Sequence, residues 1–266
     1  MSDNPFAPSL LIEERGPVRI VVINRPDTLN AVDPDIHRGL ANVWRHLAGD
    51  RDARAVVLTG AGKAFSAGGD MEMFQRIQKD PVERAYLLEE ASDVFNGLIG
   101  FPLPVVAAVN GPAVGLGCTL AVLCDLVYVA ESAFLADPHV SVGLTAGDGG
   151  APFWPLTMSI VKAKELLFFG GRISASDAVA LGLANGTAPD GEVLEHAVGV
   201  AERLAALPPQ AVQSTKRAVN LHISRAASAV LDYALAAEHQ SFDTAEHQAV
   251  VAKFLTSSPT MTPIHE

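Results

Sequence analysis

Residues 54–70 read RAVVLTGAGKAFSAGGD, and this stretch decides the expected fold class. Its first part, residues 54–59, is a run of apolar and β-branched residues typical of a buried strand. The loop that follows, residues 60–70, has glycine at four of its eleven positions. Glycine adopts positive φ without strain and lets the backbone come close to a ligand. We therefore expect a buried strand that ends in a loop suited to ligand binding.

Strands and helices alternate on both sides of this stretch. The helix expected after residue 32 begins with Asp33-Pro34, the N-cap and first-turn pattern of a helix start. The expected strands are residues 18–24, 54–59, 104–109 and 126–129, and the expected helices are residues 33–49, 81–98 and 115–124. Alternation of this kind over about 130 residues implies crossover connections and a largely buried sheet.

The strand signal ends at about Gly149, and the remaining chain has the pattern of helices. The expected helices are residues 162–169, 174–181, 192–207, 209–223 and 226–254, the last with a break near Phe242. We expect a β/α core over residues 1–200 and a helical C-terminal region over residues 201–266.

The composition favours a chain that folds around its own core and has no polyanionic partner. The chain has 266 residues, of which 49% are hydrophobic, so it can bury a core without disulfides or a structural metal. The formal net charge is −11, and no run of Lys and Arg offers the surface that nucleic acid or an anionic membrane requires. No apolar run reaches the ~18 residues of a membrane span. We expect a cytoplasmic protein with no nucleic-acid or membrane partner.

The cysteines and histidines do not form a metal-site pattern. Cys118 and Cys124 are six residues apart in an apolar, helical stretch, so we expect them on different faces of the helix, buried and reduced. The eight histidines include no HxH or HxxxH pair, and no metal site is expected. For His239 and His247, eight residues apart on an expected helix, a solvent-exposed position is the simpler interpretation.

Two glycine-rich loops each follow an expected strand and precede a helix, at residues 60–70 and 110–117. The first backbone N–H groups of a helix have no partner within the helix and lie at the positive end of its dipole. Two such groups that converge on one oxygen would stabilise a developing negative charge, as in an oxyanion hole. The alternative is that these glycines only form tight turns, since the spacing matches neither GxxxxGK[ST] nor GxGxxG.

Several motifs, in this order along the chain, resemble those of one superfamily. They are Asn24-Arg25-Pro26, Leu29-Asn30-Ala31, AFSAGGDM at residues 64–71, NGPAVGLGC at 110–118, GDGG at 147–150 and RISASDAVALGLAN at 172–185. By these motifs nearly the whole chain resembles the enoyl-CoA hydratase/isomerase, or crotonase, superfamily. The resemblance implies an α/β fold, a crotonase-type spiral of ββα repeats with a helical C-terminal trimerisation region. It also implies a homotrimer or homohexamer.

The same resemblance implies an acyl-CoA substrate, whose thioester carbonyl is held as an enolate by two backbone N–H groups. By position these would belong to Gly69 and Leu116. No cofactor is implied beyond the CoA of the substrate itself. The CoA-binding residues carried over by position are Asp27, Leu29, Ala31, Ala67, Asp70 and Met71.

Two positions depart from the pattern of the superfamily. Its hydratases have a glutamate just after the second glycine-rich loop and another after the following strands, and here these positions hold Thr119 and His139. Neither residue is a carboxylate, which argues against hydration by paired glutamates and against the carboxylate shuttle of the isomerases.

His139 and Asp148, nine residues apart, are the candidate replacement. An imidazole oriented by a carboxylate is a suitable general base near neutral pH. The spacing resembles the His/Asp pair of the crotonase-fold β-diketone hydrolases, although another histidine of those enzymes falls here on Leu116. The alternatives are that His139 is structural and that Asp148 caps a helix near Gly149.

Other acidic residues have simpler interpretations. Asp70 is expected to form a turn. Glu89, Glu90 and Asp93 are on an expected helix that could border the acyl pocket, and a solvated face is the simpler interpretation. Glu238 and Glu246 are expected on solvated or subunit-contact faces of the C-terminal helices.

Three functions remain open at this point. The first is an acyl-CoA enzyme that resembles enoyl-CoA hydratase/isomerase, a lyase with a His139/Asp148 acid–base pair. The second is a β-diketone C–C bond hydrolase, in which His139 activates water without CoA. The third is a catalytically silent acyl-CoA binding protein. CoA binding separates the second from the other two, and turnover separates the first from the third.

Overall fold

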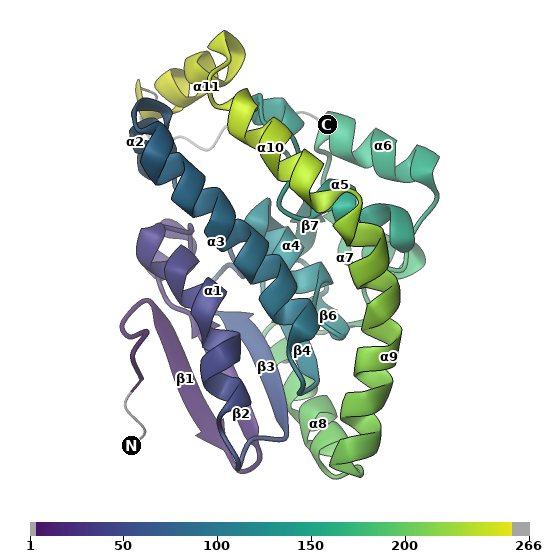
Figure 1. Ribbon diagram of the computed structural model, residues 1–266. Coiled ribbons are helices and arrows are strands. Elements are labelled where there is room, and N and C mark those ends of the chain that lie inside the picture. The colour runs from purple at the N-terminus through teal and green to yellow at the C-terminus, as the bar shows by residue number, and fades with distance from the viewer. Residues whose placement is uncertain (1–3, 257–266) are drawn as a thin grey trace.

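The computed structural model describes residues 4–256, and Figure 1 shows how its elements are arranged. A six-stranded sheet has the order β1-β2-β3-β4-β6-β9, in which β1 and β2 are antiparallel and all other neighbours are parallel. Its strands are β1 (Leu10–Arg15), β2 (Val18–Ile23), β3 (Ala55–Gly60), β4 (Val105–Val109), β6 (Leu126–Ala130) and β9 (Gly186–Ala188). The α/β fold and the four strands expected from the sequence are confirmed.

Five strands were not expected. β1 lies in the polar N-terminal segment, and β5 (Ala113–Val114), β7 (Phe134–Ala136) and β8 (Ile173–Ser174) form a second, three-stranded sheet. Because β8 and β9 follow Gly149, the expectation that strands end there is wrong. These two strands are only two and three residues long, which is too short to show an alternating pattern.

The helices before residue 101 pack beside the sheet and beside one another. α1 (Pro34–Ala48) begins as expected, because the Asp33 carboxylate accepts a hydrogen bond of 2.9 Å from the Ile36 N–H. It packs against α3 (Pro81–Gly100). A further helix, α2 (Met71–Lys79), was not expected, since it buries only Met73 and Ile77 and so has little apolar periodicity.

The C-terminal helices lie across the rest of the molecule (Figure 1). α10 contacts α3, and α11 contacts α2. The expected helix 209–223 continues to Ser228 and breaks at residues 229–230, whereas the break expected near Phe242 is confirmed. The remaining helices are α4 (Leu116–Val122), α5 (Gly150–Phe153), α6 (Ile160–Phe169), α7 (Ala175–Ala180), α8 (Val193–Ala205), α9 (Pro209–Ser228), α10 (Leu231–Ser241) and α11 (Ala245–Thr256). Residues 257–266, the end of the expected C-terminal region, lie outside the described residues.

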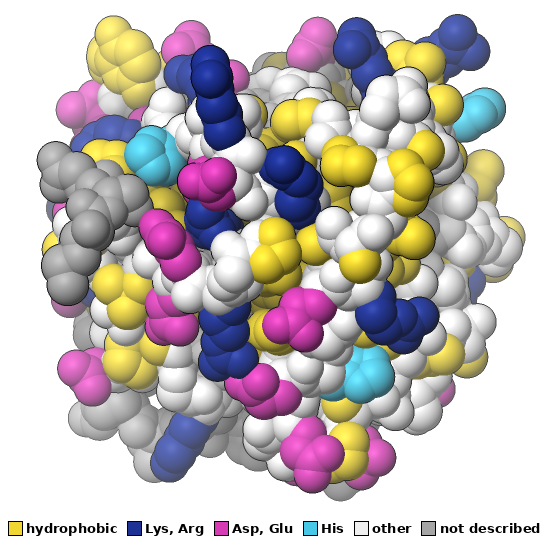
Figure 2. All heavy atoms as spheres, turned by 90° about the horizontal axis from the view of Figure 1, so that it is seen from below, with side chains coloured by type: hydrophobic (Ala, Val, Ile, Leu, Met, Phe, Trp, Pro, Cys, Tyr) yellow, Lys and Arg dark blue, Asp and Glu magenta, His cyan; other side chains and the backbone are white. Residues whose placement is uncertain are grey.

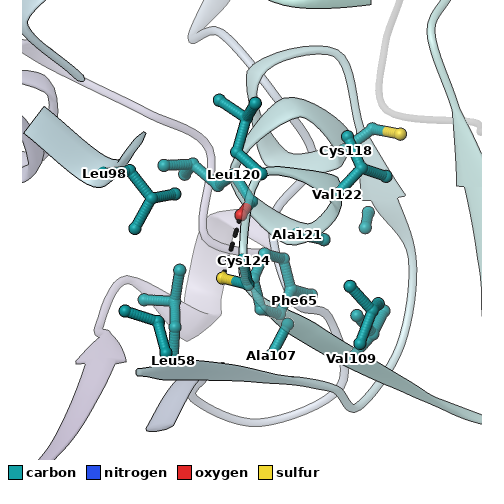
Figure 3. Packing of buried hydrophobic residues seen from close by; sticks show 14 of the residues in the cluster. Leu58, Phe65, Leu98, Ala107, Val109, Cys118, Leu120, Ala121, Val122 and Cys124 are labelled. Carbon is teal, nitrogen blue, oxygen red and sulfur yellow. Dashed lines mark hydrogen bonds between the residues drawn. The ribbon is translucent and has the colours of Figure 1, made fainter. Parts of the chain in front are cut away.

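Both cysteines are free and buried, as expected (Figure 3). They lie on and just after α4 among apolar side chains, and the Cys124 Sγ is 3.2 Å from the Leu120 carbonyl oxygen. Burial raises the pKa of both thiols, so they remain protonated and act as small core residues.

The surface mixes charges, and four apolar side chains are exposed on α6. On the face in Figure 2, acidic and basic side chains are interspersed. Within residues 4–256, no helix combines the length and hydropathy that a bilayer span requires. The exposed apolar side chains on α6 are Ile160, Val161, Phe168 and Phe169. Assembly into a homotrimer or homohexamer, with residues 201–266 as the trimerisation region, stays a prediction.

Candidate active site

A cavity lies where the two glycine-rich loops meet α3 and α10. Much of its wall is apolar and includes Val32, Phe74, Leu87, Leu88, Ala91, Leu144 and Phe242. Four ionisable side chains also line it, and they are His37, His139, Asp148 and Glu238. The cavity therefore combines an apolar wall with a small number of buried acid–base groups, as binding and catalytic sites usually do.

The loop after β3 directs the Gly69 N–H away from the neighbouring chain segment at Val32. Val32 donates to the Gly68 carbonyl at 2.7 Å, and Asp70 donates to the Val32 carbonyl at 3.0 Å. In this parallel bridge the N–H of Gly69 points away from Val32, and it has no acceptor among residues 4–256. Gly69 lines the cavity, and a Cβ at this position would collide with the Phe74 ring.

The loop after β4 places Leu116 at the first position of α4. Gly115 precedes it with φ +54°, a conformation that favours glycine. The N–H of the first helical residue has no partner within the helix, and Leu116 also lines the cavity. The structure thus brings both expected oxyanion donors, Gly69 and Leu116, to the wall of one cavity.

Asp70 fixes the loop that carries Gly69. Its carboxylate caps α2 by accepting from the Glu72 N–H at 2.8 Å, and it forms an ion pair of 2.5 Å with Arg25. Burial would raise the pKa of Asp70, but the hydrogen bonds from Arg25 and the helix start outweigh it and lower the pKa. Asp70 therefore holds the loop, in line with the turn-forming role expected from the sequence.

The six residues expected to bind CoA divide into two groups. Ala67 and Met71 line the cavity. The other four do not, and they are Asp27, Leu29, Ala31 and Asp70. The two segments are nevertheless adjacent, since the Ala67 N–H donates to the Leu29 carbonyl at 2.9 Å.

His139 lies between two carboxylates. Its Nδ1 is hydrogen-bonded to Asp137, which is almost fully buried just after β7. Its Nε2 faces the Asp148 carboxylate at 3.7 Å, which is too long for a direct hydrogen bond. Asp137, and not Asp148 as expected from the sequence, therefore orients the imidazole.

Asp148 is a buried residue of the cavity wall. It accepts a hydrogen bond of 3.1 Å from the Thr119 hydroxyl, which connects it to α4. The following helix, α5, has Gly149 at its N-cap and no side-chain cap, so the alternative that Asp148 caps this helix is wrong. Burial raises the pKa of Asp148, and the nearby His139 opposes that rise.

The two carboxylates control the charge of the imidazole. Burial alone would lower the pKa of His139, but Asp137 and Asp148 raise it well above its ordinary value. Asp137 and Asp148 therefore favour the protonated imidazolium over the neutral ring.

Glu238 reaches the cavity from α10, where the sequence analysis placed it on a solvated or subunit-contact face. That expectation is wrong, since Glu238 is only 6% exposed and its Oε2 has no hydrogen-bond partner within residues 4–256. Burial, together with repulsion from Asp148, raises the pKa of Glu238 to about 8. A sequence signal existed: Glu238 continues the buried stripe of α10 formed by Leu231, Ala234 and Leu235.

Glu238 gives a prediction for stability against pH. Its folded pKa of about 8 lies above the ordinary value of 4.5, so the stability tied to its proton is complete below pH 4.5 and is lost as pH rises through 8. In the Glu238→Gln variant this loss is absent. As pH rises from about 5 to about 9, the free energy of unfolding of the variant should therefore increase relative to that of the wild type by about 2–4 kcal/mol. The slope of this difference should reach about 1.4 kcal/mol per pH unit.

Urea unfolding across this range measures the difference. Glu246→Gln is the matched control, because Glu246 is exposed on α11, as expected from the sequence. Parallel stability curves for wild type and Glu238→Gln would contradict the raised pKa.

Two further histidines, His37 and His247, are buried. The sequence analysis expected His247 in solvent and gave no position for His37. His247 is fully buried on α11, where its Nδ1 donates to the Val142 carbonyl at 2.7 Å, so the solvent-exposed interpretation is wrong for it. His37 on α1 lines the cavity, and its Nδ1 is 2.9 Å from the Glu90 carboxylate. Glu90 is therefore not merely solvated, whereas Glu89 and Asp93 are exposed.

Comparison with known proteins identifies the family. Residues 13–260 match the family model described as enoyl-CoA hydratase/isomerase. The chain belongs to this family. Solved structures of enzymes named for this family share its fold.

Relatives of this member carry more than one reaction in their names. The chain is 33% identical over 235 residues to the short-chain-enoyl-CoA hydratase of Clostridium acetobutylicum, covering 88% of each sequence. It is 50% identical to an enoyl-CoA hydratase/isomerase from Mycobacterium paratuberculosis of known structure, with a TM-score of 0.90 over 92% of this chain and 98% of the other. A monofunctional enoyl-CoA isomerase from M. smegmatis matches at 29% identity and a TM-score of 0.69, over 81% of this chain and 94% of the other. Family membership alone thus leaves the reaction to be argued from the site.

Proposed function

We propose that the chain binds an acyl-CoA thioester and transfers a proton at carbon 2 of the acyl group, through an enolate. The single observation that carries this proposal is that two unpaired backbone N–H groups and a carboxylate-held imidazole border one cavity. The N–H groups belong to Gly69 and Leu116, and the imidazole belongs to His139.

The backbone donors suit the charge that develops in this reaction. When a proton leaves carbon 2, negative charge moves onto the thioester oxygen. The N–H of Gly69 has no acceptor in the described chain, and the N–H of Leu116 lies at the positive end of α4. Both are fixed by the fold, so they stabilise the enolate oxygen without reorganising at the moment of reaction.

His139 suits the proton transfer. Asp137 accepts from its Nδ1, which fixes the ring and directs Nε2 toward Asp148 and the cavity. Because the two carboxylates raise the pKa of His139, its resting form is the imidazolium, and Nε2–H is the proton donor to carbon 2 of the enolate. In the reverse direction the neutral ring takes this proton back.

The apolar wall suits an acyl chain. Leu87, Leu88 and Ala91 present one side of α3 to the cavity, and Phe242 borders it from the region after α10. Burial of an acyl group against this wall contributes roughly 0.8 kcal/mol for each methylene removed from water.

A second candidate function is hydrolysis of a C–C bond in a β-diketone without CoA. It is favoured by one observation: Thr119 and His139 occupy the positions where glutamates were expected, and His139 faces Asp148 at 3.7 Å. In this reaction the neutral imidazole would remove a proton from water. The raised pKa of His139 disfavours this role, because it favours the ring that already carries the proton.

The test offers the wild-type protein short to long saturated acyl-CoA thioesters in D2O, and β-diketones in ¹⁸O-labelled water, and analyses the products by mass spectrometry. We expect deuterium at carbon 2 of the recovered thioester. Binding of the thioesters without label or turnover would instead indicate a silent acyl-CoA binding protein. Cleavage of β-diketones without CoA binding would indicate the C–C hydrolase.

A further inference from the structure

We infer that His37 is a second proton-transfer residue of this cavity, which activates water for addition at carbon 3 of a 2-enoyl thioester. The inference rests on the proposed function and assigns the other half of the reaction. It comes from a second His–carboxylate pair, His37 with Glu90, which neither the motifs nor the candidate glutamate positions included.

His37 is built into the wall of the cavity. It is 2% exposed, and it lies on the buried stripe of α1 together with Leu40, Ala41 and Trp44. A histidine on such a stripe is usually satisfied inside a core, but here the stripe ends at the cavity, and His37 is part of its lining.

The hydrogen bond to Glu90 selects the atom that His37 offers. Its Nδ1 is 2.9 Å from Glu90 Oε2, and a carboxylate can only accept, so Nδ1 carries the proton. In the neutral ring Nε2 then has a free lone pair, and it has no hydrogen-bond partner among residues 4–256. This is the arrangement of a general base that is oriented by a carboxylate.

The partner of His37 lies on the helix that forms the apolar wall. Glu90 is on α3, and Leu88 and Ala91 of the same helix line the cavity together with His37. His139 lies beside the proposed oxyanion donors, as its ring is within van der Waals reach of a Cβ built on Gly115. We therefore assign carbon 2 to His139 and carbon 3 to His37.

The two histidines have complementary roles. His139 lies between Asp137 and Asp148, which favour its imidazolium, a proton donor. His37 lines the same cavity, and the ring nitrogen that does not face Glu90 can accept a proton.

The step balances without an additional reactant. An O–H bond of water breaks, its proton goes to Nε2 of His37, and the oxygen forms a bond to carbon 3. The π electrons of the C2=C3 bond move to the thioester oxygen, and the enolate then takes a proton from Nε2 of His139 at carbon 2. Transfer of one proton from His37 through solvent to His139 restores both rings, and the net reaction adds water across the double bond.

The test separates the two histidines by the substrate carbon at which each is proposed to act. Crotonyl-CoA in ¹⁸O-labelled water reports addition at carbon 3, and butyryl-CoA in D2O reports proton exchange at carbon 2 alone. In the His37→Gln variant we expect hydration to fall at least about 100-fold, and by a much larger factor than carbon 2 exchange falls. Glu90→Gln should lower the kcat of hydration with less effect on KM, and Asp93→Asn, on the exposed side of α3, is the matched control.

Each of the other outcomes would contradict one part of the inference or the proposed function. An equal loss of hydration and carbon 2 exchange in both His37→Gln and Glu90→Gln would assign the pair a structural role. Unchanged hydration would remove His37 from the reaction. Wild-type protein that exchanges carbon 2 but hydrates no enoyl thioester would overturn this inference and leave the proposed function intact. Absence of both activities would overturn the proposed function itself.

Discussion

Replacement of His139 by alanine is expected to reduce proton transfer at carbon 2 by roughly 10²–10⁴-fold. The imidazole is the group whose Nε2 faces Asp148 in the cavity, and in the proposed exchange its neutral ring removes the carbon 2 proton and its imidazolium returns a deuteron. The measurement is the rate of deuterium incorporation at carbon 2 of butyryl-CoA in D2O.

Two controls make the result specific to the proton-transfer role. His222→Ala removes an exposed imidazole on α9 and should leave the rate unchanged. Asp137→Asn preserves shape but removes the charge that holds Nδ1, so it should lower the rate and move its pH profile. A His139→Ala variant that folds and exchanges carbon 2 within about 3-fold of the wild type would contradict the assignment.

Replacement of Leu116 by proline is expected to reduce the same rate by roughly 10²–10³-fold, since it deletes one donor to the enolate oxygen. Proline has no N–H and is tolerated at the first position of a helix, where Leu116 lies. Gly115, the preceding residue, avoids the steric restriction that proline imposes on residues with a Cβ.

Leu116→Ala is the matched control for this prediction. It removes the same buried side chain but keeps the backbone N–H, so the difference between the two variants reports the donor alone. Rates are compared at saturating butyryl-CoA, with the free energy of unfolding of each variant measured by urea. Equal rates for the proline and alanine variants would remove Leu116 from the oxyanion hole.

Much of the fold followed from local patterns. The strands that became β2, β3, β4 and β6 are continuous apolar runs, because a parallel sheet buries both of its faces. The strands β8 and β9 and the helix α2 were missed, because each has too few buried residues to show a period in the sequence.

The glycine-rich loops were also predictable, although the site around them was only partly so. The proposed roles of Gly69 and Leu116 use only backbone N–H groups, and the positions of these groups follow from where a strand ends and a helix begins. His139 was found because it replaces an expected carboxylate. Its partner was misassigned, because whether Asp137 or Asp148 reaches Nδ1 depends on how the chain turns after β7.

The sequence by itself determined the α/β architecture, the family resemblance and the two loops with their backbone donors. Only the tertiary structure decided that Glu238 and His37 belong to the cavity. Both lie on the buried stripes of their helices, and a stripe shows which face of a helix is covered. Elements distant in sequence decide what covers that face. In this protein the glycine-rich loops leave a cavity beside α1, α3 and α10, and apolar side chains do not fill it.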